Sequence, residues 1–488
     1  MSKERVVAGE NMNILFIGSE AMPFIKTGGL GDVLGALPKA LSKAGVKTAI
    51  ILPLYESLKE KYFSEMEKVA EFKTSLSWRK QYVGLFKITY EGVDYYFIDN
   101  QQYFKRHGYY GYFDDGERFA FFCKAALDAI EYIDFVPDIL HLSDWQTALV
   151  PVYLKTNYSG RPEYDRLRTV FTIHNIEYQG KFGSWILGDV FGIDDRYRGI
   201  LDYHGGINLL KGAVVTCDKL TTVSPEYAWE IQYSFYGRGL ENIIKENSYK
   251  LSGILNGIDD SLYNPKKDDE VFVKYDLKSI DDKKKNKAEL QKCMGLAVDE
   301  NVTVVAMVTR LTHHKGIDLV MNCFDELMRE NIQFVMLASG EKHYETFFTD
   351  KETYYGDRAA CLKGFSDGVA RKIYAGADIF LMPSISEPCG LAQMIASKYG
   401  TITVVRETGG LKNSIVAYDP ETGKGNGVTF KQVNAHDMLG AVKRAILLLS
   451  DDEHRLKLIT NAFKSDFSWK KGAKEYIKLY KELGGLMR

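Results

Sequence analysis

Residues that can bind anions and sugar hydroxyls follow most of the strand-length apolar runs in this 488-residue chain. The carboxyl ends of parallel strands meet at one edge of a sheet, so each set is expected to converge. In chain order the candidates are Lys26, Gly28, Gly29 and Asp32 after "NILFIGSE", Asp144 after "DILHL", His174 and Asn175 after "VFTI", Arg310 and Lys315 after "VVAMVT", and Glu387, Cys389 and Gly390 after "DIFLMPS". One such segment would mean little, but five in register indicate a binding edge.

Arg310 and Lys315 lie five residues apart across an expected strand-to-helix loop. Together they could hold a diphosphate, Arg by a planar fork and Lys as a point charge. The alternative is a solvated surface pair. No D-x-D triplet occurs in the chain, and carboxylates of that kind usually bring a metal to a nucleotide-sugar diphosphate. We therefore predict no metal site, with the leaving group neutralised by cations and helix N-termini.

The segment "EPCGLAQ" (387–393) follows a buried strand and is expected to open a helix. Gly390 lets the backbone approach a ligand closely, and Glu387 could accept hydrogen bonds from sugar hydroxyls. The alternative for Glu387 is a helix cap. Cys389 lacks a paired base in the sequence, so a structural thiol is favoured over a nucleophile.

Asp144 and His174 also have structural alternatives. A lone Asp after a strand is often a helix N-cap, and a lone His is more often a satisfied core residue than a catalyst. Neither G-x-G-x-x-G nor the P-loop pattern follows the first strand, which continues as "KTGGLGD". A dehydrogenase of the NAD type, which doubly wound sheets alone would suggest, is therefore disfavoured.

Strand-length apolar runs alternate with helical patterns along the whole chain, which predicts an α/β protein with parallel sheets flanked by helices. The alternation restarts after "GILNGIDDSLYNP" (253–265), a Gly-, Asn- and Asp-rich stretch that indicates a linker. We expect two doubly wound domains, 1–258 and 259–465, and an amphipathic helix within 466–488 that packs back on the first domain. The cleft between two such domains is the default binding site.

Composition excludes several classes of partner. The net charge is −2 and no long block of like charge occurs, so nucleic-acid binding is not expected. Six cysteines without a C-x-x-C pair fit a reducing cytoplasm. The N-terminal "MSKERVVAGE" lacks the apolar segment of a signal peptide, and no apolar run is long enough to span a membrane.

Several long motifs resemble those of one family in order and spacing. They are "KTGGLGDV", "HLSDWQT", "FTIHNIEYQG", "TTVSPEYAWEI", "GILNGID", "TRLTHHKGIDL", "MPSISEPCGLAQMIASKYGT" and "VRETGGLKNSI". The family is bacterial glycogen synthase and plant starch synthase, and the resemblance runs from about residue 12 to the C-terminal helix. It implies the GT-B glycosyltransferase fold and transfer of glucose from ADP-glucose to the non-reducing end of an α-1,4-glucan, with retention of configuration and without metal or cofactor.

The resemblance also implies roles for the candidates. Lys26 reaches the donor diphosphate from a loop shaped by Gly28, Gly29 and Asp32, and Arg310 and Lys315 hold the diphosphate from the other domain. Asp144 and His174 are the positions beside the transferred glucose, Asn256 near the hinge contacts it as well, and Asn175 is a further substrate-binding position. Glu387 holds sugar hydroxyls, the backbone of Cys389, Gly390 and Leu391 meets sugar and phosphate, and Phe365 stacks on the base. Tyr178 and the aromatic segment 102–119 fall on the acceptor side.

Three residues depart from the family pattern "PSRFEPCGLTQ", namely Ile385, Ser386 and Ala392. Ala392 lacks a hydroxyl that is often present there, so only a backbone contact with the donor is expected. The segment between Tyr103 and Asp115 is shorter than in many relatives. That could alter glucan binding or merely trim a loop.

The tetrapeptide "TGGL" occurs twice, at 27–30 and 408–411. The first copy follows Lys26 and precedes Asp32, and the resemblance makes it a donor contact. The second copy has no lysine in the corresponding place, so we expect a tight strand-to-helix turn beside "EPCG". Two rival functions stay open at this point: a phosphorylase of the same fold with a pyridoxal phosphate lysine, and a catalytically silent glucan- or nucleotide-binding protein. The sequence does not distinguish ADP-glucose from UDP-glucose by physics, nor does it fix the oligomeric state.

Overall fold

The computed structural model describes residues 12–484 and divides the chain into two compact units. Within the described residues, unit 1 comprises 12–223, 228–254 and 469–484, and unit 2 comprises 224–227 and 255–468. The division at Ile254 and Leu255 falls four residues before the predicted boundary. The segment examined for a signal peptide lies outside the described residues. No helix among the described residues is long and apolar enough to cross a membrane.

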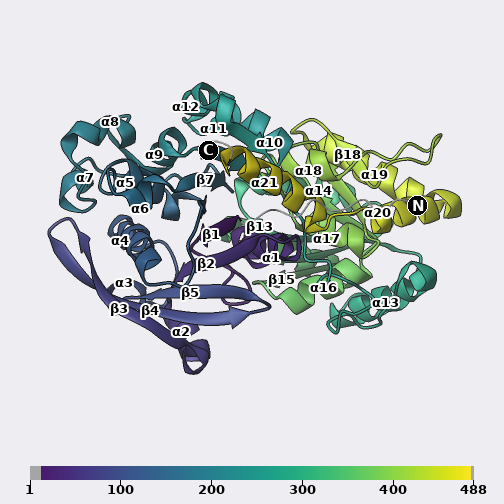
Figure 1. Cartoon of the computed structure of the whole chain (residues 1–488). Coiled ribbons are helices and arrows are strands. Elements are labelled where there is room, and N and C mark those ends of the chain that lie inside the picture. The colour runs from purple at the N-terminus through teal and green to yellow at the C-terminus, as the bar shows by residue number, and fades with distance from the viewer. Residues whose placement is uncertain (1–11, 485–488) are drawn as a thin grey trace. The chain divides into compact units, whose positions relative to one another are not determined.

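Unit 1 is built on a nine-stranded sheet. In sheet order its strands are β12 (Leu251–Gly253), β11 (Lys219–Thr222), β7 (Arg168–Ile173), β6 (Ile139–Ser143), β1 (Asn13–Ile17), β2 (Lys47–Pro53), β5 (Val93–Asp99), β4 (Arg79–Tyr90) and β3 (Glu67–Leu76). Neighbours are parallel from β12 to β5, and β5, β4 and β3 pair antiparallel. The doubly wound prediction is confirmed, with an antiparallel edge that the alternation did not predict; Figure 1 shows it as the long curved ribbon of β3 and β4.

The helices of unit 1 follow the strands as the alternation predicted. They are α1 (Gly29–Lys43), α2 (Glu56–Tyr62), α3 (Gln101–Phe104), α4 (Asp115–Asp128), α5 (Leu149–Lys155), α6 (Pro162–Asp165), α7 (Ile186–Asp189), α8 (Arg198–Leu201), α9 (Leu209–Thr216), α11 (Ser234–Gly237), α12 (Glu241–Glu246) and α21 (Trp469–Gly484), while α10 (Pro225–Glu230) has residues in both units. A small antiparallel sheet joins β8 (Lys181–Phe182), β10 (Gly206–Asn208) and β9 (Asp202–Tyr203).

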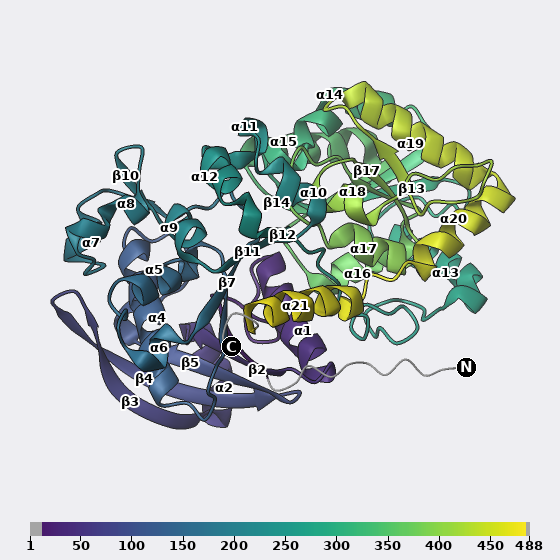
Figure 2. The same ribbon diagram turned by 45° about the horizontal axis from the view of Figure 1, so that its top comes forward.

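Unit 2 has a six-stranded, wholly parallel sheet. In sheet order its strands are β15 (Ala359–Lys363), β14 (Ile332–Gly340), β13 (Thr303–Leu311), β16 (Ile379–Met382), β17 (Ile402–Arg406) and β18 (Val428–Phe430). Its helices are α13 (Lys283–Cys293), α14 (Ile317–Leu327), α15 (Lys342–Tyr355), α16 (Asp367–Gly376), α17 (Ala392–Lys398), α18 (Gly409–Ser414), α19 (Ala435–Ser450) and α20 (Asp452–Lys464). In Figure 2, α14 and α19 lie on one side of this sheet and α16 and α17 on the other. Both faces are thus covered, which explains the unbroken apolar strands.

The last helix, α21, belongs to unit 1 although unit 2 precedes it in the chain. Its buried residues recur at helical spacing and include Ala473, Tyr476, Leu479 and Tyr480. The helix packs along α1, and Figures 1 and 2 both show the two side by side. The buried face of α21 is therefore part of the core of unit 1.

Candidate functional site

The first cluster of candidates in unit 1 is the loop between β1 and α1. Nζ of Lys26 pairs with Oδ1 of Asp32 at 2.7 Å, and both side chains are about one-fifth exposed. Gly28 is the N-cap residue of α1, and a Cβ added to it would meet nothing within 4 Å. Thr27, Gly28 and Gly29 are exposed. The loop thus presents a cation, free space and the N-terminus of a 15-residue helix, which together suit an anion.

The second cluster lies where β6 and β7 end, side by side in the sheet. Oδ1 of Asp144 accepts the backbone N–H groups of His174 at 2.7 Å and Asn175 at 3.4 Å. Asp144 has a φ of +56°, which a residue with a side chain rarely adopts. Asp144 is the N-cap residue of the following 3₁₀ turn, Trp145–Thr147, but its carboxylate makes no capping bond to that turn.

Burial sets the protonation of this cluster. It raises the pKa of Asp144 to about 7, although the N–H groups of His174 and Asn175 act to lower it. It also lowers the pKa of His174 to about 3. His174 is consequently neutral at physiological pH and offers one N–H donor and one acceptor. Tyr178 lies just beyond, with 49% of its surface exposed.

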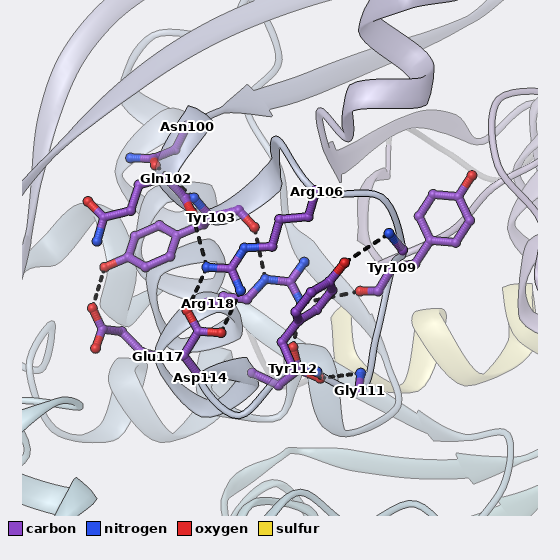
Figure 3. A network of polar contacts seen from close by, with 12 residues as sticks. Asn100, Gln102, Tyr103, Arg106, Tyr109, Gly111, Tyr112, Asp114, Glu117 and Arg118 are labelled. Carbon is purple, nitrogen blue, oxygen red and sulfur yellow. Dashed lines mark hydrogen bonds and ion pairs between the residues drawn. The ribbon is translucent and has the colours of Figure 1, made fainter.

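The segment 102–119 is held by two arginines (Figure 3). Arg106 donates to both carboxylate oxygens of Asp114 at 2.6 Å. Arg118, which is fully buried, donates from Nε to the carbonyl of Tyr103 at 2.8 Å and pairs with Asp115. Asp115 in turn accepts the backbone N–H of Gly111 at 2.7 Å. These bonds fix the path of the short aromatic loop between α3 and α4.

In unit 2 the central feature is an ion pair between Lys315 and Glu387, whose Nζ and Oε2 atoms are 2.6 Å apart. The two residues follow neighbouring strands, β13 and β16. Burial alone would raise the pKa of Glu387, but Lys315 and the hydroxyl of Ser384 hold it below its ordinary value. Glu387 makes no capping bond to α17, whose N-cap is Leu391, so the helix-cap alternative is wrong.

Arg310 is the penultimate residue of β13 and is exposed, and no polar partner of its guanidinium is found within residues 12–484. Lys315 lies in a short 3₁₀ turn, His313–Lys315, followed by Gly316 with φ +71°. A Cβ on Gly316 would lie 2.0 Å from the carbonyl oxygen of Pro383, so this turn touches the loop after β16 directly. The backbone N–H of Ile385 also donates to the carbonyl of His314 at 2.8 Å.

Four further candidates lie in unit 2: Asn256, Phe365, Cys389 and Gly390. Gly390 has φ +69°, as a close backbone approach requires. Asn256 is 5% exposed, and its Oδ1 has no hydrogen-bond partner among the described residues, so a polar group is available for a ligand. Phe365 follows β15 with 68% of its surface exposed. Burial raises the pKa of the Cys389 thiol to about 12, which favours a structural role.

Comparison with known proteins shows the family of the chain. Residues 13–246 match the family model of the starch synthase catalytic domain, and residues 294–465 match that of glycosyl transferases group 1. The chain is 46% identical to the glycogen synthase of Anoxybacillus flavithermus over 97% of its length and 98% of the relative, and 44% identical to that of Clostridioides difficile over 97% and 100%. The chain belongs to the glycogen synthase and starch synthase family.

Two solved structures support the fold. The catalytic domain of starch synthase IV from Arabidopsis thaliana, bound to ADP and acarbose, has a TM-score of 0.90 and 33% identity over 96% of this chain and 99% of that one. Sucrose-phosphate synthase from Thermosynechococcus elongatus, at 16% identity and a TM-score of 0.61, shares the fold. The predicted GT-B fold is confirmed, and so is the family that the sequence motifs indicated. As a member of this family, the chain is a hexosyltransferase that uses a nucleotide-sugar donor and a glucan acceptor.

The structure also shows two residues that support the candidate site and that sequence reasoning missed, Arg406 and Gln393. Arg406, 5% exposed, donates from Nε to the carbonyl of Ser384 at 2.8 Å and so braces the loop that carries Glu387. Gln393 donates to the carbonyl of Gly390 at 2.8 Å. An arginine at the end of an apolar strand, as in "VVRE", and a buried amide in "GLAQ" were the available signals. The sequence carries no signal for the hydrogen-bond partners of these side chains, which lie up to 22 residues away.

Proposed function

We propose that the protein transfers glucose from ADP-glucose to the non-reducing end of an α-1,4-glucan, with retention of configuration and without a metal ion. The observation that carries the proposal is the Lys315–Glu387 pair, in which a cation and a carboxylate lie 2.6 Å apart at the ends of adjacent strands. A diphosphate needs the first group and a sugar hydroxyl needs the second.

The donor contacts are assigned to unit 2. Arg310 and Lys315 neutralise the diphosphate, and the exposed ring of Phe365 stacks on the base. Glu387 accepts hydrogen bonds from sugar hydroxyls. Asn256 binds the glucose through its amide oxygen, which has no hydrogen-bond partner among the described residues. The backbone of Cys389, Gly390 and Leu391 approaches sugar and phosphate, which the positive φ of Gly390 permits.

The groups of unit 1 serve the transferred glucose and the acceptor. Lys26 supplies a further cation for the diphosphate, with Gly28, Gly29 and Asp32 shaping its loop. Asp144, His174 and Asn175 surround the glucose, and Tyr178 and the segment 102–119 contact the acceptor. Neutral His174 contributes a hydrogen bond rather than a charge, because its pKa of about 3 lies far below working pH.

The reaction then proceeds on one face of the sugar. The bond between C1 of glucose and the diphosphate oxygen breaks, and C1 bonds to O4 of the acceptor. The proton of that hydroxyl passes to the departing phosphate oxygen, so no enzyme nucleophile is required. The cations stabilise the charge that develops on the leaving group. Trapping a glucosyl–enzyme ester would contradict this step.

The decisive experiment measures incorporation of labelled glucose into glycogen from ADP-glucose and from UDP-glucose in parallel, each with and without a chelator. We expect incorporation from ADP-glucose that the chelator does not change. The product is then digested with an exo-hydrolase specific for α-1,4 bonds, which should release the label. No incorporation would favour the silent binding protein, preference for UDP-glucose would overturn the donor assignment, and loss with chelator would overturn metal independence.

We also propose that the protein works in the cytoplasm. All six cysteines are free, and four of them are buried. Reduced thiols of this kind are usual where glutathione keeps proteins reduced. Fractionation of the source cells, followed by immunodetection, tests the assignment; recovery outside the cytoplasmic fraction would contradict it.

A further inference from the structure

Glu20 is a buried carboxylate directly after β1 that has no place in the roles assigned so far. It follows the loop residue Ser19, and it is only 4% exposed. Burying a carboxylate is costly unless donors surround it. The partners of Glu20 therefore show what the structure gains from it.

Three hydrogen bonds satisfy this carboxylate, and they come from two segments. Its Oε2 accepts the backbone N–H of Thr27 at 2.6 Å, and its Oε1 accepts the hydroxyl of Thr27 at 2.6 Å. The hydroxyl of Tyr110 donates to the same Oε1 at 2.7 Å. The Tyr110 oxygen is also 2.9 Å from Oγ of Ser19.

The two segments have different constraints. Tyr110 stands between two residues of the aromatic loop that are held in place: Arg118 donates to the carbonyl of Tyr109, and Gly111 donates to Asp115 (Figure 3). Thr27 stands between Lys26 and the exposed Gly28. Glycines give a loop conformational freedom, so the bonds from Glu20 are a principal restraint on this stretch. Glu20 thereby connects the loop that carries Lys26 to the loop that Arg106 and Arg118 hold in place.

We propose that Glu20 is a positioning residue that couples the Lys26 loop to the Tyr110 loop. The inference rests on the proposed function, in which Lys26 acts on the donor and the segment 102–119 on the acceptor. A displacement of Tyr110 changes the hydrogen bonds that Glu20 can offer to Thr27, and through Thr27 the position of Lys26. Acceptor binding is in this way communicated to the donor cation within a single unit.

Substitutions of the three residues that form these hydrogen bonds, Glu20, Thr27 and Tyr110, test the proposal. Glu20→Gln keeps the size of the side chain but removes its charge. Its amide oxygen can still accept the N–H of Thr27, but only when its NH2 group faces the hydroxyls of Thr27 and Tyr110, which must then accept instead of donate. Tyr110→Phe and Thr27→Val remove one hydroxyl each. Tyr164→Phe is the matched control, because its hydroxyl also donates to a glutamate, Glu131, at 2.9 Å in the same unit.

The first readout is hydrogen exchange of the amide of Thr27, which does not depend on activity. We expect Tyr110→Phe to accelerate it at least about threefold and Glu20→Gln about tenfold, because each weakens the bonds that protect this amide. Tyr164→Phe should leave it unchanged. Exchange at Thr27 that is the same in Tyr110→Phe as in the wild type would overturn the coupling.

The second readout is kinetic and separates a positioning role from a structural one. Glu20→Gln should lower kcat about tenfold or more and raise KM for ADP-glucose, at an unfolding temperature within a few degrees of wild type. Thr27→Val and Tyr110→Phe should be non-additive in kcat, since both act through Glu20. Additive effects would overturn the inference, as would a wild-type kcat in Glu20→Gln.

The two readouts also separate this inference from the proposed function. If the wild type transfers no glucose from either donor, the proposed function fails, while the exchange experiment still decides whether Glu20 couples the loops. If the wild type is active and exchange at Thr27 ignores Tyr110, the inference fails alone. If Glu20→Gln does not fold, the Thr27→Val and Tyr110→Phe variants carry the same test.

Discussion

The two copies of "TGGL" share four residues and have opposite surroundings. At 27–30 the glycines are exposed, and a Cβ on Gly28 would meet open space. At 408–411 both glycines are buried, and a Cβ on Gly409 or Gly410 would lie 2.0 Å from the carbonyl oxygens of Glu387 and Cys389 respectively. The predicted tight turn beside "EPCG" is confirmed. Glycine provides freedom in the first copy and close backbone contact in the second.

The difference extends to what each copy does for its candidate site. The first presents Lys26 and is restrained by Glu20. The second carries no cation to the ligand, and the N–H of Gly410 donates to the carbonyl of Glu387 at 3.1 Å, which fixes the loop that bears the carboxylate. A motif of this length therefore does not determine a role. The atoms that pack against it do.

The sharpest test compares one glycine from each copy. Gly410→Ala should cost about 4 kcal/mol or more of unfolding free energy, because the new Cβ overlaps a backbone that cannot move independently. Gly28→Ala should cost less than about 1 kcal/mol, since its φ of −163° suits any residue. Denaturant unfolding of both variants provides the measurement. Equal losses of unfolding free energy in the two variants would contradict the different roles of the two copies.

A second test concerns the pair that the later copy braces. Lys315→Ala should lower turnover about 100-fold or more, equivalent to about 3 kcal/mol, and should also destabilise the protein because Glu387 is left buried without its cation. Adding Glu387→Gln should restore stability but not activity. Kinetics and thermal unfolding of the single and double variants decide this. Near-normal turnover in Lys315→Ala would remove the residue from the mechanism.

The lysines beside the two copies supply a third test. Lys26→Ala should lower kcat/KM for the nucleotide sugar about 30-fold or more, roughly 2 kcal/mol, because a cation aimed at the diphosphate is lost. Lys412, in the second copy's helix, pairs with Glu226 at the surface, and Lys412→Ala should change kcat/KM less than about twofold. Steady-state kinetics with ADP-glucose would show the contrast. A similar loss in both variants would mean that the second copy also serves the donor.

The smallest expected effect contrasts the carboxylates of the two units. The pKa of Asp144 rises from its ordinary 3.8 to about 7, so the folded state holds a proton that the unfolded state loses between these values. Stability from this group therefore falls as pH rises from about 4 to 7. Glu387 behaves oppositely: its contribution is present above its ordinary pKa and is lost as pH falls through the lowered value.

Unfolding temperatures of the wild type and Asp144→Asn across pH 4–8 check this sign. The variant should lack the decline and should be the more stable protein at pH 8. The same substitution at the exposed Asp452 should leave the profile unchanged. A decline that survives in Asp144→Asn would assign it to another group.

The parts of the fold that sequence predicted are those with local signals. Buried parallel strands such as β1 and β16 are continuous apolar runs, and "KTGGLGD" and "EPCG" mark the loops that follow them. The strands β3 and β4 were missed because their polar and apolar residues alternate at an exposed edge. The candidates Lys315 and Glu387 were found one by one, but their pairing across 72 residues has no local signature. The same holds for Glu20 and Tyr110, which are 90 residues apart.

His141 shows that two residues of one sequence motif can have different roles. It stands three residues before Asp144, yet both of its ring nitrogens have partners in the core of unit 1, with Nδ1 2.6 Å from the hydroxyl of Tyr480 on α21 and Nε2 2.7 Å from that of Thr172. Burial lowers the pKa of His141 to about 3, so the ring stays neutral between these hydroxyls. Its role is to join β6, β7 and the last helix.

That last helix has a consequence for biosynthesis. The ribosome emits nearly all of unit 1 first, then unit 2, and only then α21, which completes the core of unit 1. Unit 2 is thus the first to be complete, while α1 and His141 wait for their partner helix. A fragment ending at Ile254 would leave the apolar flank of α1 uncovered and would be prone to aggregate, whereas joining residues 469–484 to it through a short linker should yield a stable, separately expressible unit.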